Sequence, residues 1–206
     1  MKAILSDLDG VLVDSQAAIM RAWRSWGAKN GVAGEAIEAI PHGRPSREVI
    51  AMLAPHLDPA AESLVVEALE VEDTEGLVAL PGARALFDVA EPVAVVTSGT
   101  LPLATTRLRS VGLPIPDVLV TPERISRGKP DPEGYLLAAR ELGVDPADCV
   151  VLEDAPAGLR AGRAAGMHVV GITTTHDPAE LDAHELAPSI VAWLRRGARE
   201  RPSATA

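Results

Sequence analysis

The chain has few of the features that mark secreted or membrane-bound proteins. Its 206 residues include one cysteine, Cys149, which excludes an internal disulfide and which we expect to be a buried structural thiol. No apolar run approaches the roughly 20 residues that a transmembrane helix requires. The amino terminus enters a strand pattern directly and has no signal-peptide pattern. These absences predict a cytoplasmic protein.

Positive charge is also scarce. The chain has 19 lysines and arginines against 29 aspartates and glutamates, which gives a formal net charge of -10. Because this field repels polyanions, we expect no binding to nucleic acid or to anionic membrane surfaces. A small anionic substrate remains compatible, but it needs a strong local positive site. The lysines available for such a site are Lys2, Lys29 and Lys129.

What the chain does contain is an alternation of short apolar runs and helical segments. The runs predict strands at 3–5, 93–96, 118–120, 150–152 and 169–172. Helices predicted at 101–111, 132–142 and 157–165 each end at a glycine, the residue that best tolerates a left-handed helix cap. Continuous apolar strands alternating with helices indicate an α/β protein with a parallel sheet covered on both faces.

Residues 15–80 break this alternation. They show helical periodicity at 17–26, 47–53 and 60–71 and no convincing strand, so we expect a helical cap inserted after the first strand. The core then comprises 1–14 and 81–195, and residues 196–206, which lack an apolar pattern, are expected to be a disordered tail. A run of acids predicts a solvated helix face in the insertion: Glu62, Glu67, Glu70, Glu72, Asp73 and Glu75.

Carboxylates follow two of the predicted strands. Ligands of open parallel sheets bind outside the carboxyl ends of the strands. Asp7 and Asp9 follow the first strand, and their i, i+2 spacing predicts that both side chains converge on one site. Glu153 and Asp154 follow the strand at 150–152. Each pair taken alone is also typical of a turn or a solvated loop.

Groups suited to phosphate binding accompany these carboxylates. Thr97, Ser98 and Gly99 follow the strand at 93–96 and offer hydroxyls and backbone N–H groups to a phosphate oxygen. Lys129 lies in a loop that Pro130 and Pro132 stiffen. These residues alone fit a helix cap and a surface charge. Their joint occurrence with the carboxylates favours a catalytic site.

The four segments together resemble the motifs of the haloacid dehalogenase superfamily, in the branch with a helical cap after the first motif. They read DLDGVLVDS from Asp7, VVTSG around Thr97, GKPDPEGY around Lys129 and LEDAPAG around Asp154. The resemblance extends from Met1 to about Asp182. It implies a Rossmann-like core with an inserted α-helical cap, and an enzyme that transfers phosphoryl groups.

The resemblance also implies a role for each motif residue. Asp7 would attack phosphorus and form an aspartyl-phosphate, and Asp9 would act as general acid and then as general base. Mg²⁺ would be held by Asp7, the Asp9 backbone carbonyl and Asp154, with Glu153 assisting directly or through water. The phosphoryl group would be bound by Thr97, Ser98, Gly99 and Lys129.

Departures from related motifs favour a phosphatase. Dehalogenases of the family lack the second aspartate, and phosphonoacetaldehyde hydrolases combine alanine there with a Schiff-base lysine in the cap. This chain has Asp9, and its one cap lysine, Lys29, is expected to be solvated at a helix end. The alternative is a β-phosphoglucomutase-like hexose-phosphate mutase, but such mutases carry a histidine where this chain has Ile19. A catalytically silent metabolite sensor is a second alternative, which the intact carboxylates disfavour.

The cap segment 42–48 resembles that of sugar and polyol phosphatases. We therefore expect a small phosphorylated sugar or polyol as the substrate. The candidate contacts in the cap are His42, Gly43, Arg44 and Arg47. Which of the two arginines contacts substrate stays open, because the motif aligns in two ways. We expect a monomer or a weak homodimer.

Overall fold

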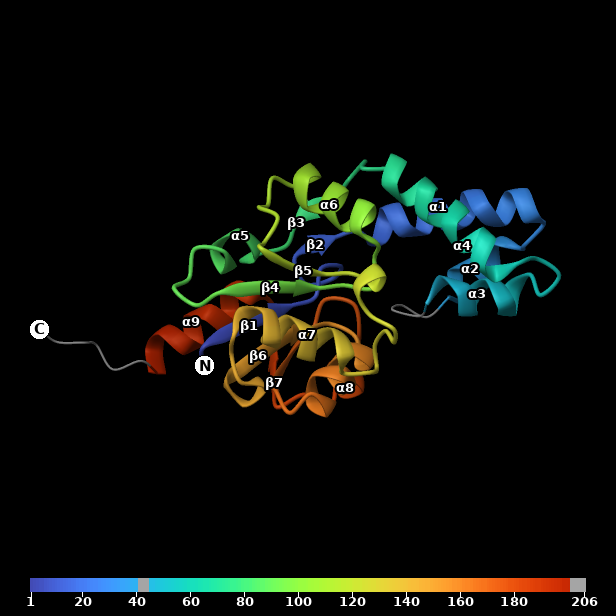
Figure 1. Cartoon of the computed structure of the whole chain (residues 1–206). Helices are drawn as coiled ribbons and strands as arrows, with labels where there is room; N and C mark the ends of the chain where they lie inside the picture. Colours follow the sequence, from blue (N-terminus) through green and yellow to red (C-terminus); the bar gives the residue numbers. More distant parts are fainter. Residues whose placement is uncertain (41–44, 201–206) are drawn as a thin grey trace, which may run out of the picture.

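The computed structural model describes residues 1–40 and 45–200 (Figure 1). The strands are β1 Ala3–Ser6, β2 Val13–Asp14, β3 Val78–Ala79, β4 Val93–Val96, β5 Val118–Val120, β6 Cys149–Glu153, β7 His168–Ile172 and β8 Glu185–Ala187. The helices are α1 Gln16–Asn30, α2 Gly34–Glu38, α3 Ser46–Leu53, α4 Pro59–Glu72, α5 Ala83–Leu86, α6 Leu101–Ser110, α7 Glu133–Leu142, α8 Pro156–Ala164 and α9 Ile190–Glu200. None of these described helices is both long and apolar enough to cross a membrane.

Six strands form one sheet in the order β5-β4-β1-β6-β7-β8. All neighbouring strands in this sheet pair in parallel. The chain visits β4 and β5 on one side of β1 and then β6, β7 and β8 on the other. The strand order therefore reverses at β1, and open α/β sheets bind their ligands beside such a reversal. The α/β prediction with a parallel sheet is confirmed.

Helices cover both faces of this sheet (Figure 1). Ile4 of β1 faces one apolar cluster, which includes side chains of α5, α6 and α9. Its neighbours Ala3 and Leu5 face the opposite cluster, which includes side chains of α7 and α8. Because successive side chains of a strand point to opposite faces, a strand buried on both faces must be apolar throughout. This explains the continuous apolar runs in the sequence.

Helices α1 to α4, which we call the cap, lie beside the sheet and pack around an apolar cluster of their own (Figure 1). The ring centroids of Trp23 and Trp26 are 5.5 Å apart in an edge-on arrangement within this cluster. The two connections between cap and core run side by side, because β2 and β3 pair in antiparallel fashion and place Val13 opposite Ala79. The expected helical insertion therefore has a core separate from that of the sheet.

Most differences from the sequence prediction involve short elements. β2, β3, β8, α2 and α5 were not predicted, since two to five residues are too few to show a clear periodicity. Helix α9, with eleven residues, was also not predicted. Helix α9 continues to Glu200 and so includes residues 196–200 of the expected tail. Residues 201–206 of that tail lie outside the described part of the chain.

The acidic run on α4 differs more strongly from its prediction. Glu70 is buried rather than solvated and pairs with Arg107 of α6. Glu62 accepts a hydrogen bond from the indole of Trp26, and Glu67 accepts one from the Thr100 hydroxyl. A charge run in the sequence carries no information about which members meet a partner on another helix. The solvated-face prediction is therefore wrong for Glu70, whereas Glu62 and Glu67 are partly exposed.

Candidate active site

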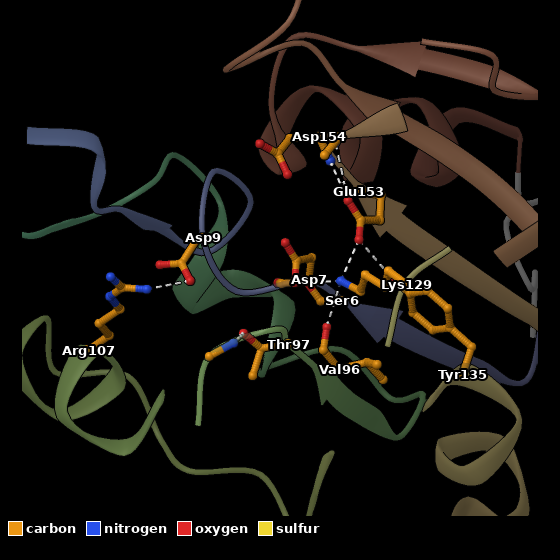
Figure 2. A network of polar contacts seen from close by, with 12 residues as sticks. Ser6, Asp7, Asp9, Val96, Thr97, Arg107, Lys129, Tyr135, Glu153 and Asp154 are labelled. Carbon is orange, nitrogen blue, oxygen red and sulfur yellow. Dashed lines mark hydrogen bonds and ion pairs between the residues drawn. The ribbon is translucent and has the colours of Figure 1, made fainter. Parts of the chain in front are cut away.

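The carboxyl ends of β1, β4 and β6 bring the predicted motifs together (Figure 2). The backbone N–H of Asp7 donates to the Leu152 carbonyl at 2.9 Å, and that of Thr97 donates to the Val120 carbonyl at 3.0 Å. These bonds continue the sheet ladders one residue past the strands. Asp7 and Thr97 are therefore fixed by the sheet itself, which suits groups that must keep a constant geometry.

Lys129 is the centre of the polar network. Its Nζ donates to Asp7 Oδ1 at 2.7 Å, to Glu153 Oε1 at 2.5 Å and to the Val96 carbonyl at 3.0 Å. The Nζ also lies 5.4 Å from the centroid of the Tyr135 ring. Burial alone would lower the pKa of Lys129, but the carboxylates of Asp7 and Glu153 outweigh it and raise this pKa well above its ordinary value. The ammonium is therefore charged at neutral pH.

Glu153 holds Lys129 with a carboxylate that is fully hydrogen-bonded. It accepts four hydrogen bonds, from Lys129 and Tyr135 on Oε1 and from the backbone N–H groups of Asp154 and Ala155 on Oε2. A carboxylate has about four lone-pair sites, so these four bonds use its acceptor capacity. Glu153 is thus suited to orient Lys129, and its predicted part in metal binding, directly or through water, stays a prediction.

Gly158 makes this position of Glu153 possible. A Cβ at residue 158 would lie 1.7 Å from Glu153 Oε1, so a larger residue at the start of α8 would displace the carboxylate. The same carboxylate affects Tyr135, whose pKa is raised well above its ordinary value by burial and by the charge of Glu153. The tyrosine hydroxyl therefore stays protonated and donates to Glu153.

Asp7 and Asp154 supply oxygens suited to a divalent cation. Together with Glu153 they form a group whose ligand atoms lie within 4.8 Å of one another, and hard carboxylate oxygens suit Mg²⁺. Burial raises the pKa of Asp7 to about 7 despite the opposing charge of Lys129. Burial and the charge of Glu153 raise the pKa of Asp154 well above its ordinary value. Such carboxylates lack enough positive charge nearby, which is the condition that a bound cation corrects.

Two neighbours restrict the position of Asp154. The Thr175 hydroxyl donates to Asp154 Oδ2. Gly10 has φ of +75°, and a Cβ there would lie 2.1 Å from the same oxygen. The positive φ and the space taken by this carboxylate both require glycine at residue 10.

Asp9 does not share a partner with Asp7 (Figure 2). Its Oδ1 accepts from the Ser15 hydroxyl at 2.6 Å, and its Oδ2 accepts from Arg107 Nη1 at 2.6 Å. The predicted convergence of the two aspartates assumed extended backbone, whereas β1 ends at Ser6. The two carboxylates therefore leave the same loop toward different partners. Their convergence on one substrate stays a prediction.

Arg107 joins this loop to the cap. Its Nη2 contacts Glu70 Oε2 at 2.5 Å, and its side chain is only 3% exposed. Burial would lower the pKa of Arg107, but Asp9 and Glu70 outweigh it and raise this pKa further. Burial raises the pKa of Glu70 to about 7 although Arg107 opposes the shift. One guanidinium thus neutralises carboxylates from both the core and the cap.

The predicted phosphate-binding loop has a defined turn. The Thr97 hydroxyl accepts the Gly99 N–H at 3.0 Å, and Thr97 itself is buried whereas Ser98 is exposed. The Thr97 hydroxyl retains its own proton for donation to an oxygen of the substrate. The roles predicted for Thr97, Ser98 and Gly99 in phosphoryl binding stay predictions.

The predicted cap residues are only partly placed. His42, Gly43 and Arg44 lie outside the described residues, and Arg47 is exposed on α3. Lys29 is exposed in the last turn of α1, as predicted. Ile19 packs, partly buried, against the apolar cluster of the cap. The contacts of Arg44 and Arg47 with substrate therefore stay predictions.

Sequence reasoning missed several residues of the network: Ser15, Glu70, Arg107, Tyr135 and Thr175. A signal for two of them was present. Arg107 shares an i, i+3/i+4 face with Leu103 and Ala104, and Glu70 lies four residues after Val66, all three of these apolar residues being buried. A single charge on an apolar helix face indicates a buried ion pair.

Comparisons with known proteins identify the family. A family model described as haloacid dehalogenase-like hydrolase matches residues 1–166. Hexitol phosphatase A of Escherichia coli is 45% identical over 193 residues, covering 90% of this chain and 89% of that protein. Glycerol-1-phosphate phosphohydrolase 2 of Saccharomyces cerevisiae is 37% identical, covering 86% and 76%. The crystal structure of a hydrolase from Pseudomonas syringae, 25% identical, superposes with a TM-score of 0.83 over 98% of this chain and 100% of that one.

Proposed function

The chain belongs to the haloacid dehalogenase-like hydrolases, and on this premise we propose that it is a Mg²⁺-dependent phosphatase of small sugar or polyol phosphate monoesters. The observation that carries the proposal is the bridge of Lys129 between Asp7 and Glu153, with Asp154 within reach of the same ion. The bridge places a fixed positive charge against a carboxylate at the end of the central strand. Such an arrangement suits attack on a phosphoryl group, whose charge must be neutralised.

The reaction uses Asp7 as the nucleophile. One of its carboxylate oxygens attacks phosphorus while the bond from phosphorus to the alcohol oxygen breaks, and Asp9 gives its proton to that oxygen. Water then attacks phosphorus and gives a proton to Asp9 as the bond from Asp7 to phosphorus breaks. The products are the free alcohol and inorganic phosphate. Lys129, paired to Asp7 Oδ1 at 2.7 Å, keeps the nucleophile oriented.

The carboxylates of Asp7 and Asp154, with the backbone carbonyl of Asp9, would hold Mg²⁺. When bound, this ion supplies positive charge to the phosphoryl oxygens. Glu153 serves the site through Lys129, because its own oxygens are fully hydrogen-bonded. The hydroxyl of Thr97 and the backbone around Ser98 and Gly99 would bind the remaining phosphoryl oxygens.

Transfer to water is favoured over transfer to a second sugar. At the position where the mutases have a histidine, this chain has the apolar Ile19, which has no proton to give and packs against the cap cluster. The relatives at 45% and 37% identity are both phosphatases, of a hexitol phosphate and of glycerol 1-phosphate by their names. These matches support polyol phosphates as the substrate class.

Phosphate release from a panel of sugar and polyol monophosphates tests this proposal. We expect Mg²⁺-dependent release from polyol phosphates, and no conversion of glucose 1-phosphate into glucose 6-phosphate. Chelation of the metal should abolish release, and added Mg²⁺ should restore it. Conversion of glucose 1-phosphate without phosphate release would instead identify a mutase.

Metal binding should depend on pH in a defined direction. The pKa of Asp7, about 7 in the folded protein, lies above its usual value in an unfolded chain. The stabilisation from the protonated group is therefore complete at low pH and is lost as the pH rises through about 7. Since Mg²⁺ binds the ionised carboxylates, we expect it to raise the melting temperature more at pH 8 than at pH 6.

Thermal melts with a fixed Mg²⁺ concentration or with chelator, at both pH values, measure this difference. The Asp154→Asn variant is the control, because it keeps Asp7 and Lys129 but removes one proposed ligand. It should lose most of the Mg²⁺-induced increase at pH 8. An increase of equal size at both pH values, or one retained in Asp154→Asn, would contradict the assigned ligands.

A further inference from the structure

Arg107 connects three parts of the molecule through one buried guanidinium. It comes from α6 of the core, donates from Nη1 to Asp9 Oδ2 at 2.6 Å, and contacts Glu70 Oε2 of cap helix α4 from Nη2 at 2.5 Å. Its side chain is almost fully removed from solvent, and that of Glu70 is 9% exposed. The contact to Asp9 and the contact to the cap are thus made by one rigid planar group.

Both oxygens of Asp9 are held by groups linked to the cap. Oδ2 is bound by Arg107, whose other contact is Glu70. Oδ1 is bound by Ser15, the residue at the amino-terminal end of α1. Figure 2 shows the Asp9 side chain turned toward Arg107 and away from the contact between Lys129 and Asp7. The direction of this carboxylate is therefore set by its two partners.

The link between cap and core at α4 and α6 includes a second contact. The Thr100 hydroxyl, at the amino-terminal end of α6, donates to Glu67, which lies three residues before Glu70 on α4. A displacement of α4 relative to α6 would therefore act on Arg107 through Glu70 and on the loop after β4 through Glu67. Asp9 would lose or change one of its two partners in the same displacement.

Stability alone is a weak reason for this arrangement. Two carboxylates share one guanidinium here, and buried ion pairs seldom stabilise a protein more than apolar residues of equal volume do. Orientation is a stronger reason, because an acid–base group misplaced by about 1 Å can cost about 100-fold in rate. Resting on the function proposed above, we propose that Arg107 is a positioning residue that directs the Asp9 carboxylate and makes its direction depend on cap helix α4.

The Arg107→Lys variant tests this role with two kinds of substrate. Lysine keeps the charge but, as a single ammonium on a flexible stem, cannot hold two carboxylates in the fixed fork of arginine. A polyol phosphate needs a proton from Asp9 for its leaving alkoxide, whereas p-nitrophenolate leaves p-nitrophenyl phosphate without one. We expect kcat/KM to fall about tenfold more for the preferred polyol phosphate of the panel than for p-nitrophenyl phosphate.

A second readout uses the polyol phosphate alone. Because Arg107 is not placed against substrate, its loss should lower kcat while KM changes by less than about threefold. The Glu70→Gln variant removes the cap charge and leaves Arg107 and Asp9 intact. It should lower kcat, and lower kcat/KM more for the polyol phosphate than for p-nitrophenyl phosphate, as in Arg107→Lys. The reason is that Glu70 contacts Arg107, which in turn contacts Asp9.

Arg21→Lys is the matched control. Arg21 also forms a two-pronged ion pair, with Asp73 at 2.6 and 3.0 Å, but this pair lies between α1 and the end of α4 and does not contact Asp9. This variant should change kcat/KM for both substrates by the same factor. Thermal melts of all variants separate a loss of folded protein, which lowers activity on both substrates equally, from a loss of positioning.

The outcomes separate this inference from the function on which it rests. If the unmodified protein releases phosphate from no panel member, the proposed function fails and the inference fails with it. If it releases phosphate and Arg107→Lys loses activity equally on both substrates, with KM raised, the positioning role is overturned while the function stands. If Arg107→Lys gives the expected result but Glu70→Gln changes kcat/KM for both substrates by the same factor, the dependence on α4 is overturned.

Discussion

Replacing Asp7 with asparagine is expected to lower kcat for phosphate release by about 10⁴-fold or more, because the amide cannot form the bond to phosphorus that the carboxylate forms. The fold should survive the change. Burial raises the pKa of Asp7 to about 7, so the ionised group is already unfavourable in the folded protein. Lys129 keeps Glu153 as a charged partner in the variant. We therefore expect a melting temperature equal to or above that of the unmodified protein in metal-free buffer.

Asp9→Asn is the informative comparison for Asp7→Asn. It removes the proton carrier and keeps the nucleophile, so it should still take the phosphoryl group from p-nitrophenyl phosphate and then release phosphate slowly. Acid quenching followed by mass measurement should detect phosphorylated Asp9→Asn and no phosphorylated Asp7→Asn. Covalent phosphate on Asp7→Asn would show that another residue is the nucleophile.

Replacing Lys129 with methionine is expected to destabilise the protein by about 3–5 kcal/mol, because removal of one partner leaves buried carboxylates without a counter-charge. Glu153 is 1% exposed and Asp7 is 13% exposed, so water replaces little of the lost interaction. Activity should fall with stability, since the nucleophile loses its orienting contact. Urea unfolding in metal-free buffer measures the free-energy difference from the shift in midpoint.

Two further variants make this prediction specific. Lys2→Met is the matched control, because Lys2 also pairs with an aspartate, Asp148, at 2.8 Å, but is 70% exposed and should lose no measurable stability. The double variant Lys129→Met with Glu153→Gln should be less destabilised than the sum of the two single variants, because it removes one buried carboxylate together with the lysine. Additive losses would contradict direct coupling of the two residues.

The α/β fold class could be read from the sequence because its signals are local. The strands β4 and β5 have the predicted bounds, and β1, β6 and β7 are each longer by one or two residues. Continuous apolar runs reflect a sheet buried on both faces, and glycines at helix ends reflect a left-handed cap that other residues seldom adopt. The observed positive φ of Gly112, Gly143 and Gly166 confirms those helix ends.

The sequence predicted which residues belong to the site but not which of their side chains contact one another. Each motif was recognisable at a strand end, since parallel strands bring their carboxyl ends to one edge. The sequence did not show which carboxylate oxygen pairs with which nitrogen. Asp9 was expected beside Asp7, but its pairing with Arg107, 98 residues away in sequence, could not be predicted. Glu153 was expected near a metal and lies in the acidic group that could hold one, but its four hydrogen bonds, among them those to Lys129 and Tyr135, could not be read from the sequence.

The sequence by itself determined the parallel sheet, the helical insertion, the carboxylates at the strand ends and the resemblance that names the chemistry. These features depend on residue type and short spacing, which the order of residues records directly. The tertiary structure alone decided that Glu70 is buried, that Arg107 joins it to Asp9, and that Lys129 bridges Asp7 and Glu153. Charged side chains become buried and paired only when distant elements pack together. Removal from water raises the free energy of each charged group that has no partner, so the packed structure keeps the buried charges that have one.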